Sequence, residues 1–222
     1  MKNAVVYGAT GLVGSQLTIL LLNNTNYEKV YTVVRKSTGL SHSKLIEINN
    51  DYTKLSETAN LLPGADVFCC LGTTSSKTKD RNMYRQIDYG YPVEIANLAA
   101  KNQSESYAVV SSIGASEKSG TFYLKTKGDM ERDVLLAGVN KTYIVRPSIL
   151  AGNRAENRIG EKIGLAVMTV AGYALMGSWK KYRAINAKTV AAALIYLVTV
   201  NPPEKQVYES DEVESFGQKY LK

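Results

Sequence analysis

Short apolar runs rich in β-branched residues recur through the first two thirds of the chain, and most of them are separated by enough residues for a helix. They occupy residues 3–8, 29–35, 44–49, 65–71, 106–112 and 142–146. Continuous rather than alternating runs are typical of strands covered on both faces, and parallel strands need long, usually helical crossovers. The pattern therefore predicts an α/β fold with a doubly wound parallel sheet, the Rossmann architecture.

The length of the chain fits one domain. With 222 residues, 45% of them hydrophobic, it can bury one core but not two of ordinary size. We therefore expect a single domain over residues 1–222, with helices that include Val13–Leu22, Val93–Ala100 and Thr189–Val200. The alternation of strands and helices loosens after residue 150, so residues 151–187 are predicted to form a small, variable, substrate-facing region.

The charge balance favours an anionic ligand. Lys and Arg number 27 against 20 Asp and Glu, which gives a net charge of +7. The basic residues form no strip interleaved with aromatic residues, as single-stranded nucleic acid would require, so no nucleic-acid partner is expected. The composition also excludes disordered, collagen-like and disulfide-scaffold classes.

The cysteines and the first residues bear on location. Cys69 and Cys70 are neighbours, and with the lone His42 they cannot form a usual zinc site, so we expect no metal and a reducing compartment. Glycine breaks the first apolar run too early for a secretory signal, so we expect a cytoplasmic protein. Ile163–Trp179 is uncharged but only just long enough to span a bilayer; a buried helix or lid is favoured, and no membrane partner is expected.

A glycine-rich loop follows the first predicted strand. Gly8, Gly11 and Gly14 stand at positions one, four and seven of a strand-to-helix turn, with Thr10, Leu12 and Val13 among them. Glycines there allow a sharp turn and let a diphosphate approach bare backbone at the start of a helix, whose N–H groups face the anion. The loop predicts a dinucleotide site more strongly than a plain glycine-rich turn, because it lies between a strand and an amphipathic helix.

The end of the second predicted strand bears on which dinucleotide binds. A carboxylate there would bind the ribose 2′-hydroxyl of NAD, but the chain has Arg35 and Lys36. A guanidinium matches a phosphate and cannot accept from a hydroxyl, so NADP(H) is predicted in preference to NAD(H), unless these are two solvated charges. Asp51, with Tyr52 beside it, follows the third strand and is a candidate contact to adenine.

Small residues follow the fourth predicted strand. Leu71, Gly72 and Thr73 lie where the strand order of such a sheet reverses and where open α/β sheets bind ligands. Small side chains there let a cofactor pass close to the backbone. Cys69 and Cys70 are predicted to be buried packing without a redox role.

A tyrosine and a lysine follow the fifth predicted strand, which ends in Ser111 and Ser112. Tyr123 and Lys127 form the chain's only Tyr-x-x-x-Lys pair, and four residues bring both to one face of a helix. A neighbouring ammonium stabilises a phenolate, which makes the phenol a better proton shuttle at neutral pH. The alternative is an ordinary exposed helix face; the position beyond the strand favours catalysis, with a serine hydroxyl holding the carbonyl oxygen.

Taken together, the motifs Gly8–Gly14, Phe68–Thr74, Ser111-Ser112, Tyr123–Gly128 and Arg146–Leu150 resemble those of the short-chain dehydrogenase/reductase superfamily. The resemblance is to its atypical branch, among the Tat-interacting-protein-like oxidoreductases. It implies an NADP(H)-binding fold with Ser112, Tyr123 and Lys127 in the catalytic positions. It also implies cofactor contacts at Ser111, Tyr123 and Lys127, with Pro147, Ser148 and Ile149 near the nicotinamide.

The function predicted is an NADP(H)-dependent oxidoreductase that reduces a small carbonyl or quinone-like substrate. The alternative is an NADP(H)-binding redox sensor or regulatory scaffold with little turnover. Sugar-nucleotide epimerisation ranks lower, because the chain after Pro147 is short and Arg35 disfavours NAD.

The other charged residues fall into two basic groups and one acidic group. Basic residues at 77–85 and 154–183 could attract an anionic small-molecule substrate or compensate the cofactor phosphates. They are Lys77, Lys79, Arg81 and Arg85, and Arg154, Arg158, Lys162, Lys180, Lys181 and Arg183. The acidic residues Glu209, Asp211, Glu212 and Glu214 could pair with a basic patch in the same chain or in a partner, but a solvated end is favoured. The chain is expected to be a monomer or a homodimer.

Overall fold

The computed structural model describes residues 1–151, 181–200 and 205–222. In these ranges seven parallel strands form one sheet in the order β3-β2-β1-β4-β5-β6-β9. They are β1 (Lys2–Tyr7), β2 (Tyr27–Val34), β3 (Leu45–Asn49), β4 (Asp66–Cys69), β5 (Ser106–Val110), β6 (Thr142–Arg146) and β9 (Val207–Glu209). The order runs outward in both directions from the β1–β4 pair, so the predicted doubly wound parallel sheet is confirmed.

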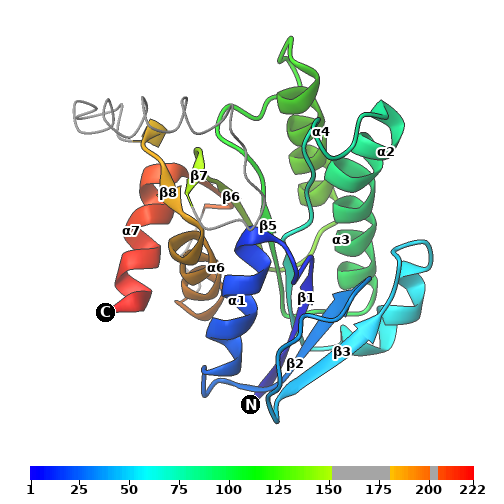
Figure 1. Cartoon of the computed structure of the whole chain (residues 1–222), viewed down its shortest axis with the longest axis vertical. Coiled ribbons are helices and arrows are strands. Elements are labelled where there is room, and N and C mark those ends of the chain that lie inside the picture. The colour runs from blue at the N-terminus through cyan, green and yellow to red at the C-terminus, as the bar shows by residue number, and fades with distance from the viewer. Residues whose placement is uncertain (152–180, 201–204) are drawn as a thin grey trace.

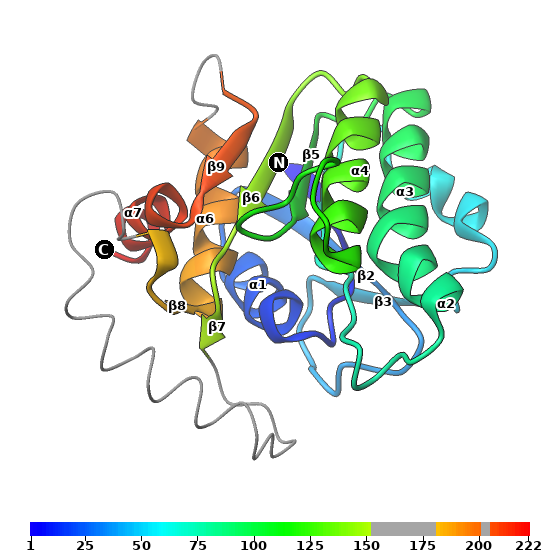
Figure 2. The ribbon, with the colours of Figure 1, turned by 90° about the horizontal axis from the view of Figure 1, so that it is seen from above.

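Helices cover both faces of the sheet (Figures 1 and 2). One face carries α1 (Leu12–Leu22) and α6 (Ala187–Val200), with α7 (Ser210–Leu221) packed on α6. The other carries the 3-10 helix η1 (Leu55–Leu61), α3 (Tyr91–Lys101) and α4 (Phe122–Leu136). A short helix α2 (Arg81–Arg85) and a π-helical turn η2 (Gln86–Gly90) run directly into α3. The two-residue strands β7 (Leu150–Ala151) and β8 (Ile185–Asn186) pair separately.

Successive side chains of β1 enter two different cores. Ala4 and Val6 pack with α1 and α6, whereas Val5 and Tyr7 pack with the α3 and α4 side. The buried phenol of Tyr7 hydrogen-bonds Thr58 Oγ1 at 2.6 Å, so its polar atom is satisfied inside the core. A strand buried on both faces reads as a continuous apolar run, which is why the sequence pattern located it.

The C-terminal segment differs from the expected solvated end. Glu209 and Glu212 form a reciprocal capping box at the start of α7, and Val213 is fully buried against the core. Glu209 also accepts a hydrogen bond from Arg146 Nη1 at 2.9 Å, which ties β9 to β6. Glu209 and Glu212 are therefore part of the fold, because helix starts favour carboxylates and Glu209 has a half-buried cationic partner.

No helix in the described ranges is long and apolar enough to cross a membrane. The uncharged stretch Ile163–Trp179 lies outside those ranges, as do Arg154, Arg158, Lys162 and Lys180 and most of the predicted variable region.

Candidate dinucleotide and catalytic site

The glycine loop connects β1 to α1 in close contact with the loop after β4. Gly8 has a φ of +81°, and a Cβ on it would lie 2.8 Å from the backbone of Cys70. A Cβ on Gly14 would lie 2.2 Å from the carbonyl oxygen of Gly8, so only glycine fits. No side chain caps α1, which leaves amide N–H groups of its first turn as donors for an anion. This part of the structure fits the diphosphate of a dinucleotide.

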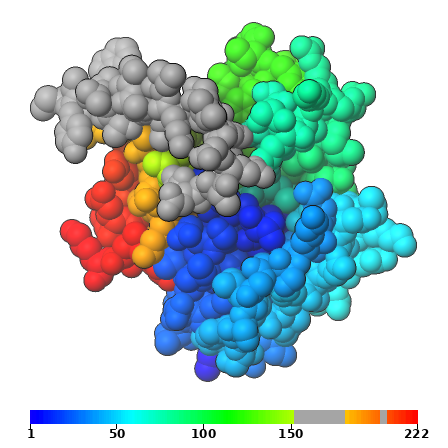
Figure 3. Space-filling model, viewed as in Figure 1, coloured from blue at the N-terminus to red at the C-terminus, as the bar shows by residue number. Residues whose placement is uncertain are grey.

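The space-filling view shows the same neighbourhood from outside. The blue surface of the N-terminal segment adjoins the green surface of the half that carries α2 and α4 (Figure 3). Thr10 and Gly11 are exposed here and Leu12 is half-buried, whereas Val13 is buried beneath them. The loop's backbone is thus presented to solvent above a packed support.

The predicted adenosine contacts follow two paired strands. Val34 and Asn49 are register partners, so Arg35 and Asp51 leave neighbouring strand ends, and both are exposed. The loop after Lys36 is held by Glu47, whose carboxylate accepts from Thr38 N at 2.8 Å; hydrogen bonds from Ser37 and Thr38 lower the pKa of Glu47.

Tyr52 is placed differently from Asp51. Its φ is +71°, its side chain is buried, and its hydroxyl donates to the carbonyl of Val33 at 2.8 Å. Burial raises the pKa of Tyr52 to about 12. The phenol is thus used within the core, whereas the Asp51 carboxylate lies at the surface and accepts from Thr53 N at 2.9 Å.

The loop after β4 passes directly over a buried ion pair. β4 ends at Cys69, two residues before the predicted end of this strand at residue 71. Leu71, Gly72 and Thr73 therefore lie beyond the sheet. Asp88 of η2, 1% exposed, accepts from Thr73 N at 2.8 Å and from Lys127 Nζ at 3.0 Å. A Cβ on Gly72 would lie 3.4 Å from Asp88 Oδ1. Burial raises the pKa of both Cys69 and Cys70 thiols.

Lys127 is nearly enclosed, at 3% exposure. Its ammonium also lies 3.4 Å from the carbonyl oxygen of Val110, at the end of β5. Burial alone would lower the pKa of Lys127, but the Asp88 carboxylate and, after it, the Tyr123 phenol raise the pKa above its usual range. Lys127 is therefore a fixed cation at all physiological pH values.

Sequence reasoning missed Asp88 and Tyr84, which face the predicted pair from the opposite helix. Tyr84 and Asp88 are four residues apart, as are Tyr123 and Lys127. Tyr84 meets Tyr123 edge to face with ring centroids 6.5 Å apart, while Asp88 meets Lys127. The signal was the same spacing, but it had no strand end or family motif to give it weight.

The two serines after β5 have different environments. Ser111 is buried and donates to the Glu131 carboxylate, which also accepts from Arg146. Ser112 is half-buried, and among the described residues its hydroxyl has only a weak contact, with Ile113 O at 3.4 Å. Of the two, Ser112 therefore has the hydroxyl that is available to a ligand.

The loop after β6 lies beside Ser112, because Ile113 N donates to Pro147 O at 3.0 Å. Ser148 hydrogen-bonds Ser210 and the carbonyl of Arg183, whereas the Ile149 side chain is 36% exposed.

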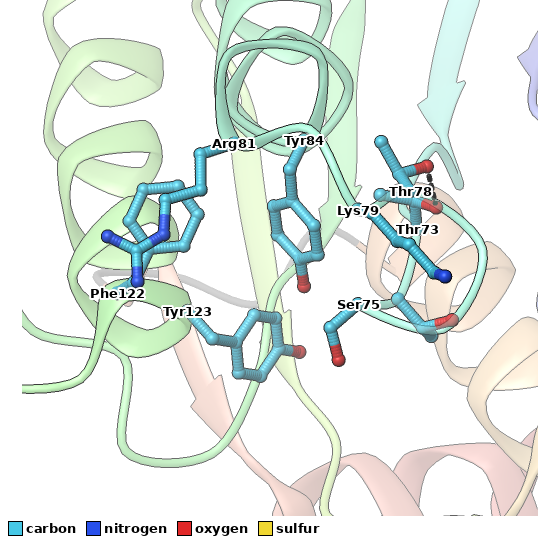
Figure 4. A pocket seen from close by; sticks show the side chains of 9 residues that line it. Thr73, Ser75, Thr78, Lys79, Arg81, Tyr84, Phe122 and Tyr123 are labelled. Atoms are coloured by element: carbon cyan, nitrogen blue, oxygen red, sulfur yellow. Dashed lines mark hydrogen bonds between the residues drawn. The ribbon is translucent and has the colours of Figure 1, made fainter.

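A cavity of about 550 Å³ opens in front of Tyr123. Its lining consists of Thr73, Thr74, Ser75, Thr78, Lys79, Arg81, Tyr84, Phe122 and Tyr123. The hydroxyls of Tyr84 and Tyr123 point into the same space in Figure 4. Of the basic residues at 77–85, Lys79 and Arg81 line the cavity, whereas Arg85 pairs with Asp129 at 2.9 Å. Within the ranges described, no group of three metal-binding side chains occurs.

Comparison with known proteins agrees with this geometry. A family profile described as NAD(P)H-binding matches residues 8–199. "Protein FMP52, mitochondrial" of Debaryomyces hansenii is 33% identical over 158 residues, which is 70% of each chain. "Protein fmp52, mitochondrial" of Aspergillus clavatus is 31% identical over 204 residues, covering 88% of this chain and 86% of that protein.

Solved structures share the fold at low sequence identity. MoeE5 in complex with UDP-glucose and NAD has a TM-score of 0.67 and 19% identity, over 98% of this chain and 81% of that one. The UDP-N-acetylglucosamine 4-epimerase of Methanobrevibacter ruminantium, in complex with UDP-N-acetylmuramic acid, has a TM-score of 0.70 and 17% identity, over 93% and 75%.

The relatives correct the expected location. Their names place them in mitochondria, so the expectation of a cytoplasmic protein is wrong, and the comparison points to the mitochondrion instead. That expectation rested on adjacent free thiols and a short first apolar run, and neither feature distinguishes one reducing compartment from another.

The solved structures confirm the predicted fold, and the profile confirms the predicted NAD(P)H-binding family. Given the profile match over most of its length, the chain belongs to the NAD(P)H-binding family.

Proposed function

We propose that this protein is an NADP(H)-dependent oxidoreductase of the short-chain dehydrogenase/reductase type that reduces a small carbonyl or quinone-like substrate. The observation that carries the proposal is the Tyr123 phenol on a cavity wall, one helical turn from a buried Lys127 ammonium. A proton donor backed by a fixed cation, at the carboxyl edge of a dinucleotide-binding sheet, suits carbonyl reduction.

In this proposal the cofactor lies along that edge. The residues that would hold its diphosphate are Gly8, Thr10, Gly11, Leu12 and Val13. Those toward the adenosine end are Arg35, Lys36, Asp51 and Tyr52. Those toward the nicotinamide are Leu71, Gly72, Thr73, Ser111, Tyr123, Lys127, Pro147, Ser148 and Ile149. Bound NADPH would supply a hydride.

The chain's own groups would manage the proton and the oxygen. Tyr123 donates its hydroxyl proton to the carbonyl oxygen of the substrate. The Lys127 ammonium offsets the negative charge that forms on the Tyr123 oxygen as the proton leaves, and Asp88 keeps that ammonium in place. The free hydroxyl of Ser112 orients the substrate oxygen.

Tyr123→Phe tests the proposal. The variant is expected to bind NADPH within about twofold of wild type and to lose at least about 99% of turnover, since general acid catalysis contributes roughly 10²–10⁴-fold. Fluorescence titration measures binding, and NADPH oxidation with aldehydes, ketones and quinones measures turnover.

The matched control is Tyr220→Phe on α7, whose hydroxyl accepts from Asn24 Nδ2 at 2.8 Å, and it should keep full activity. Unchanged turnover in Tyr123→Phe would refute the assignment of Tyr123. Tight NADPH binding by the wild type without turnover on the whole panel would favour a redox sensor instead.

A further inference from the structure

The cavity in front of Tyr123 has two unlike walls (Figure 4). One wall is aromatic: Tyr84 meets Phe122 edge to face with ring centroids 5.6 Å apart, and it meets Tyr123 in the same manner. The other wall carries the hydroxyls of Thr73, Ser75 and Thr78 and the ammonium of Lys79. A flat, conjugated molecule fits the first wall, and a polar substituent fits the second.

The charge of the cavity is one-sided. Among the described residues, its lining includes Lys79 and Arg81 and no carboxylate. Nearby carboxylates in the described part of the chain have other partners: Asp80 accepts from Met83 N at 2.7 Å and Asp88 from Lys127. Arg81 lies over the Phe122 ring at 5.5 Å, which leaves Lys79 as the cation facing the hydroxyl wall. A negative substituent would therefore meet positive potential without opposition.

Tyr84 supplies an independent observation. Its side chain is only 7% exposed, its hydroxyl points into the cavity, and no described residue hydrogen-bonds that hydroxyl. Burial, then Asp88 and Tyr123, raises the pKa of Tyr84 to about 12, so the phenol keeps its proton and acts as a donor. A donor that faces the cavity and has no partner among the described residues is available to an acceptor on a ligand.

We propose that this cavity is a substrate site for an aromatic or conjugated carbonyl compound that carries a carboxylate or a phosphate, with the anion held by Lys79 and Tyr84. The ring lies against the wall of Tyr84 and Phe122, and the carbonyl reaches Tyr123. The inference rests on the proposed function, which it deepens by naming the substrate class.

Matched aldehydes test the site in the full-length protein. The probes are para-carboxybenzaldehyde, its methyl ester as the neutral counterpart, and para-formylphenyl phosphate, each with NADPH. The wild type is expected to reduce at least one anionic aldehyde with a kcat/KM at least about tenfold above that of the ester. The better of the two anionic probes identifies the anion as carboxylate or phosphate.

Lys79→Gln and Tyr84→Phe should each raise the KM of the preferred anionic aldehyde about tenfold. The ratio of its kcat/KM to that of the ester should fall close to one in both variants. Lys101→Gln, an exposed lysine in the last turn of α3, is the matched control and should leave the preference unchanged. Unaltered NADPH affinity in each variant verifies the fold. Equal reduction of ester and acids by the wild type would overturn the anion site but not the proposed function.

A binding experiment separates failure of the site from failure of the function. Benzoate, phenyl phosphate and neutral benzamide are titrated calorimetrically into the NADPH-loaded protein. Suppose that no aldehyde is turned over but that an anion binds, and that its affinity falls about tenfold in both Lys79→Gln and Tyr84→Phe. This outcome supports the anion site and refutes the reductase function. If no anion binds in preference to benzamide, the site is refuted.

Discussion

At the level of single residues, Arg35 tests the proposed cofactor preference. It is exposed directly after β2, and Asp51 follows the end of the paired strand β3. Arg35→Gln is expected to weaken NADPH binding by about ten- to a hundredfold, because a charge-assisted hydrogen bond to the 2′-phosphate is lost, and to leave NADH binding nearly unchanged. Fluorescence titration with both cofactors measures this. Lys29→Gln, at the other end of the same strand, is the control, and equal losses for both cofactors would contradict the assignment.

Asp88 allows a prediction about stability. Asp88→Asn would leave the Lys127 ammonium buried without a counter-charge, which should lower the free energy of unfolding by about 3–5 kcal/mol. Urea unfolding measures the change. The matched control is Asp80→Asn at the N-cap of α2, where asparagine serves about as well as aspartate. Losses of the same size in both variants would show that the ion pair is unimportant.

Residues differ in how far sequence alone could find them. Gly8 and Gly14 were predictable because their spacing reflects backbone approach, and the backbone distances require glycine at both positions. Asp88 was not predictable, because no strand end or motif marks it in the sequence and it gains its role only when η2 meets α4. Tyr84 was hidden for the same reason: its open hydroxyl is a property of the assembled cavity.

Among the elements, Arg146 of β6 connects the preceding helix α4 with β9, which lies more than 60 residues further along the chain. From the end of β6 its guanidinium donates to Glu131 of α4, with Nη2 to Oε2 at 2.6 Å, and to Glu209 of β9. The hydrogen bonds that Arg146 donates to these carboxylates, Glu131 first among them, raise the pKa of Arg146 despite partial burial. The network holds α4, and with it Lys127, against the sheet.

Arg146→Gln should lower the free energy of unfolding by about 3–5 kcal/mol, because the nearly buried Glu131 carboxylate loses its cation. Chemical denaturation measures this. Arg132→Gln is the matched control: its pairs with Glu117 and Asp133 are exposed, so its loss should be much smaller. Comparable losses in the two variants would mean that the cluster does not hold these elements together.

Elements with long apolar runs were the predictable ones. β1 and β2 begin and end within two residues of their expected bounds, since β1 is buried from Ala4 to Tyr7 and β2 is mostly buried from Val30 to Val34. β9 is only three residues long and is defined by its register with β6, where Val145 pairs with Tyr208. No local sequence pattern therefore predicts it. The acidic start of α7 was mistaken for a solvated end because its cationic partner lies more than 60 residues away.

For the molecule as a whole, pH should act through Asp66, a buried carboxyl of β4 that accepts from Tyr27 and Ser106. Burial raises the pKa of Asp66 above its ordinary value of 3.8. The native state therefore binds this proton more tightly than the unfolded state, and the stability that Asp66 contributes falls as pH rises through the folded pKa.

Asp66→Asn removes this dependence. The free energy of unfolding of the variant minus that of wild type should rise with pH above about 4 and then level off. Urea unfolding over a pH series measures it. Asp51→Asn should show the opposite slope, because hydrogen bonds from Thr53 lower the pKa of Asp51. A difference that stays constant with pH in Asp66→Asn would contradict the prediction.

At this scale the sequence allowed the fold class and NAD(P)H binding to be predicted, because strand spacing and the glycine loop are local features with one common solution. The predicted cellular location was wrong, because composition reflects a chemical environment and does not specify a compartment. The cavity could not be predicted, because its walls come from α2, α4 and the loop after β4.

The contact between Gly8 and the backbone of Cys70 bears on protein engineering. Because a single added methyl group would collide there, the nucleotide loop and the crossing segment after β4 must vary as a unit. A chimera that imports one of them from a relative has to import the other, and libraries aimed at altered coenzyme use should randomise both together.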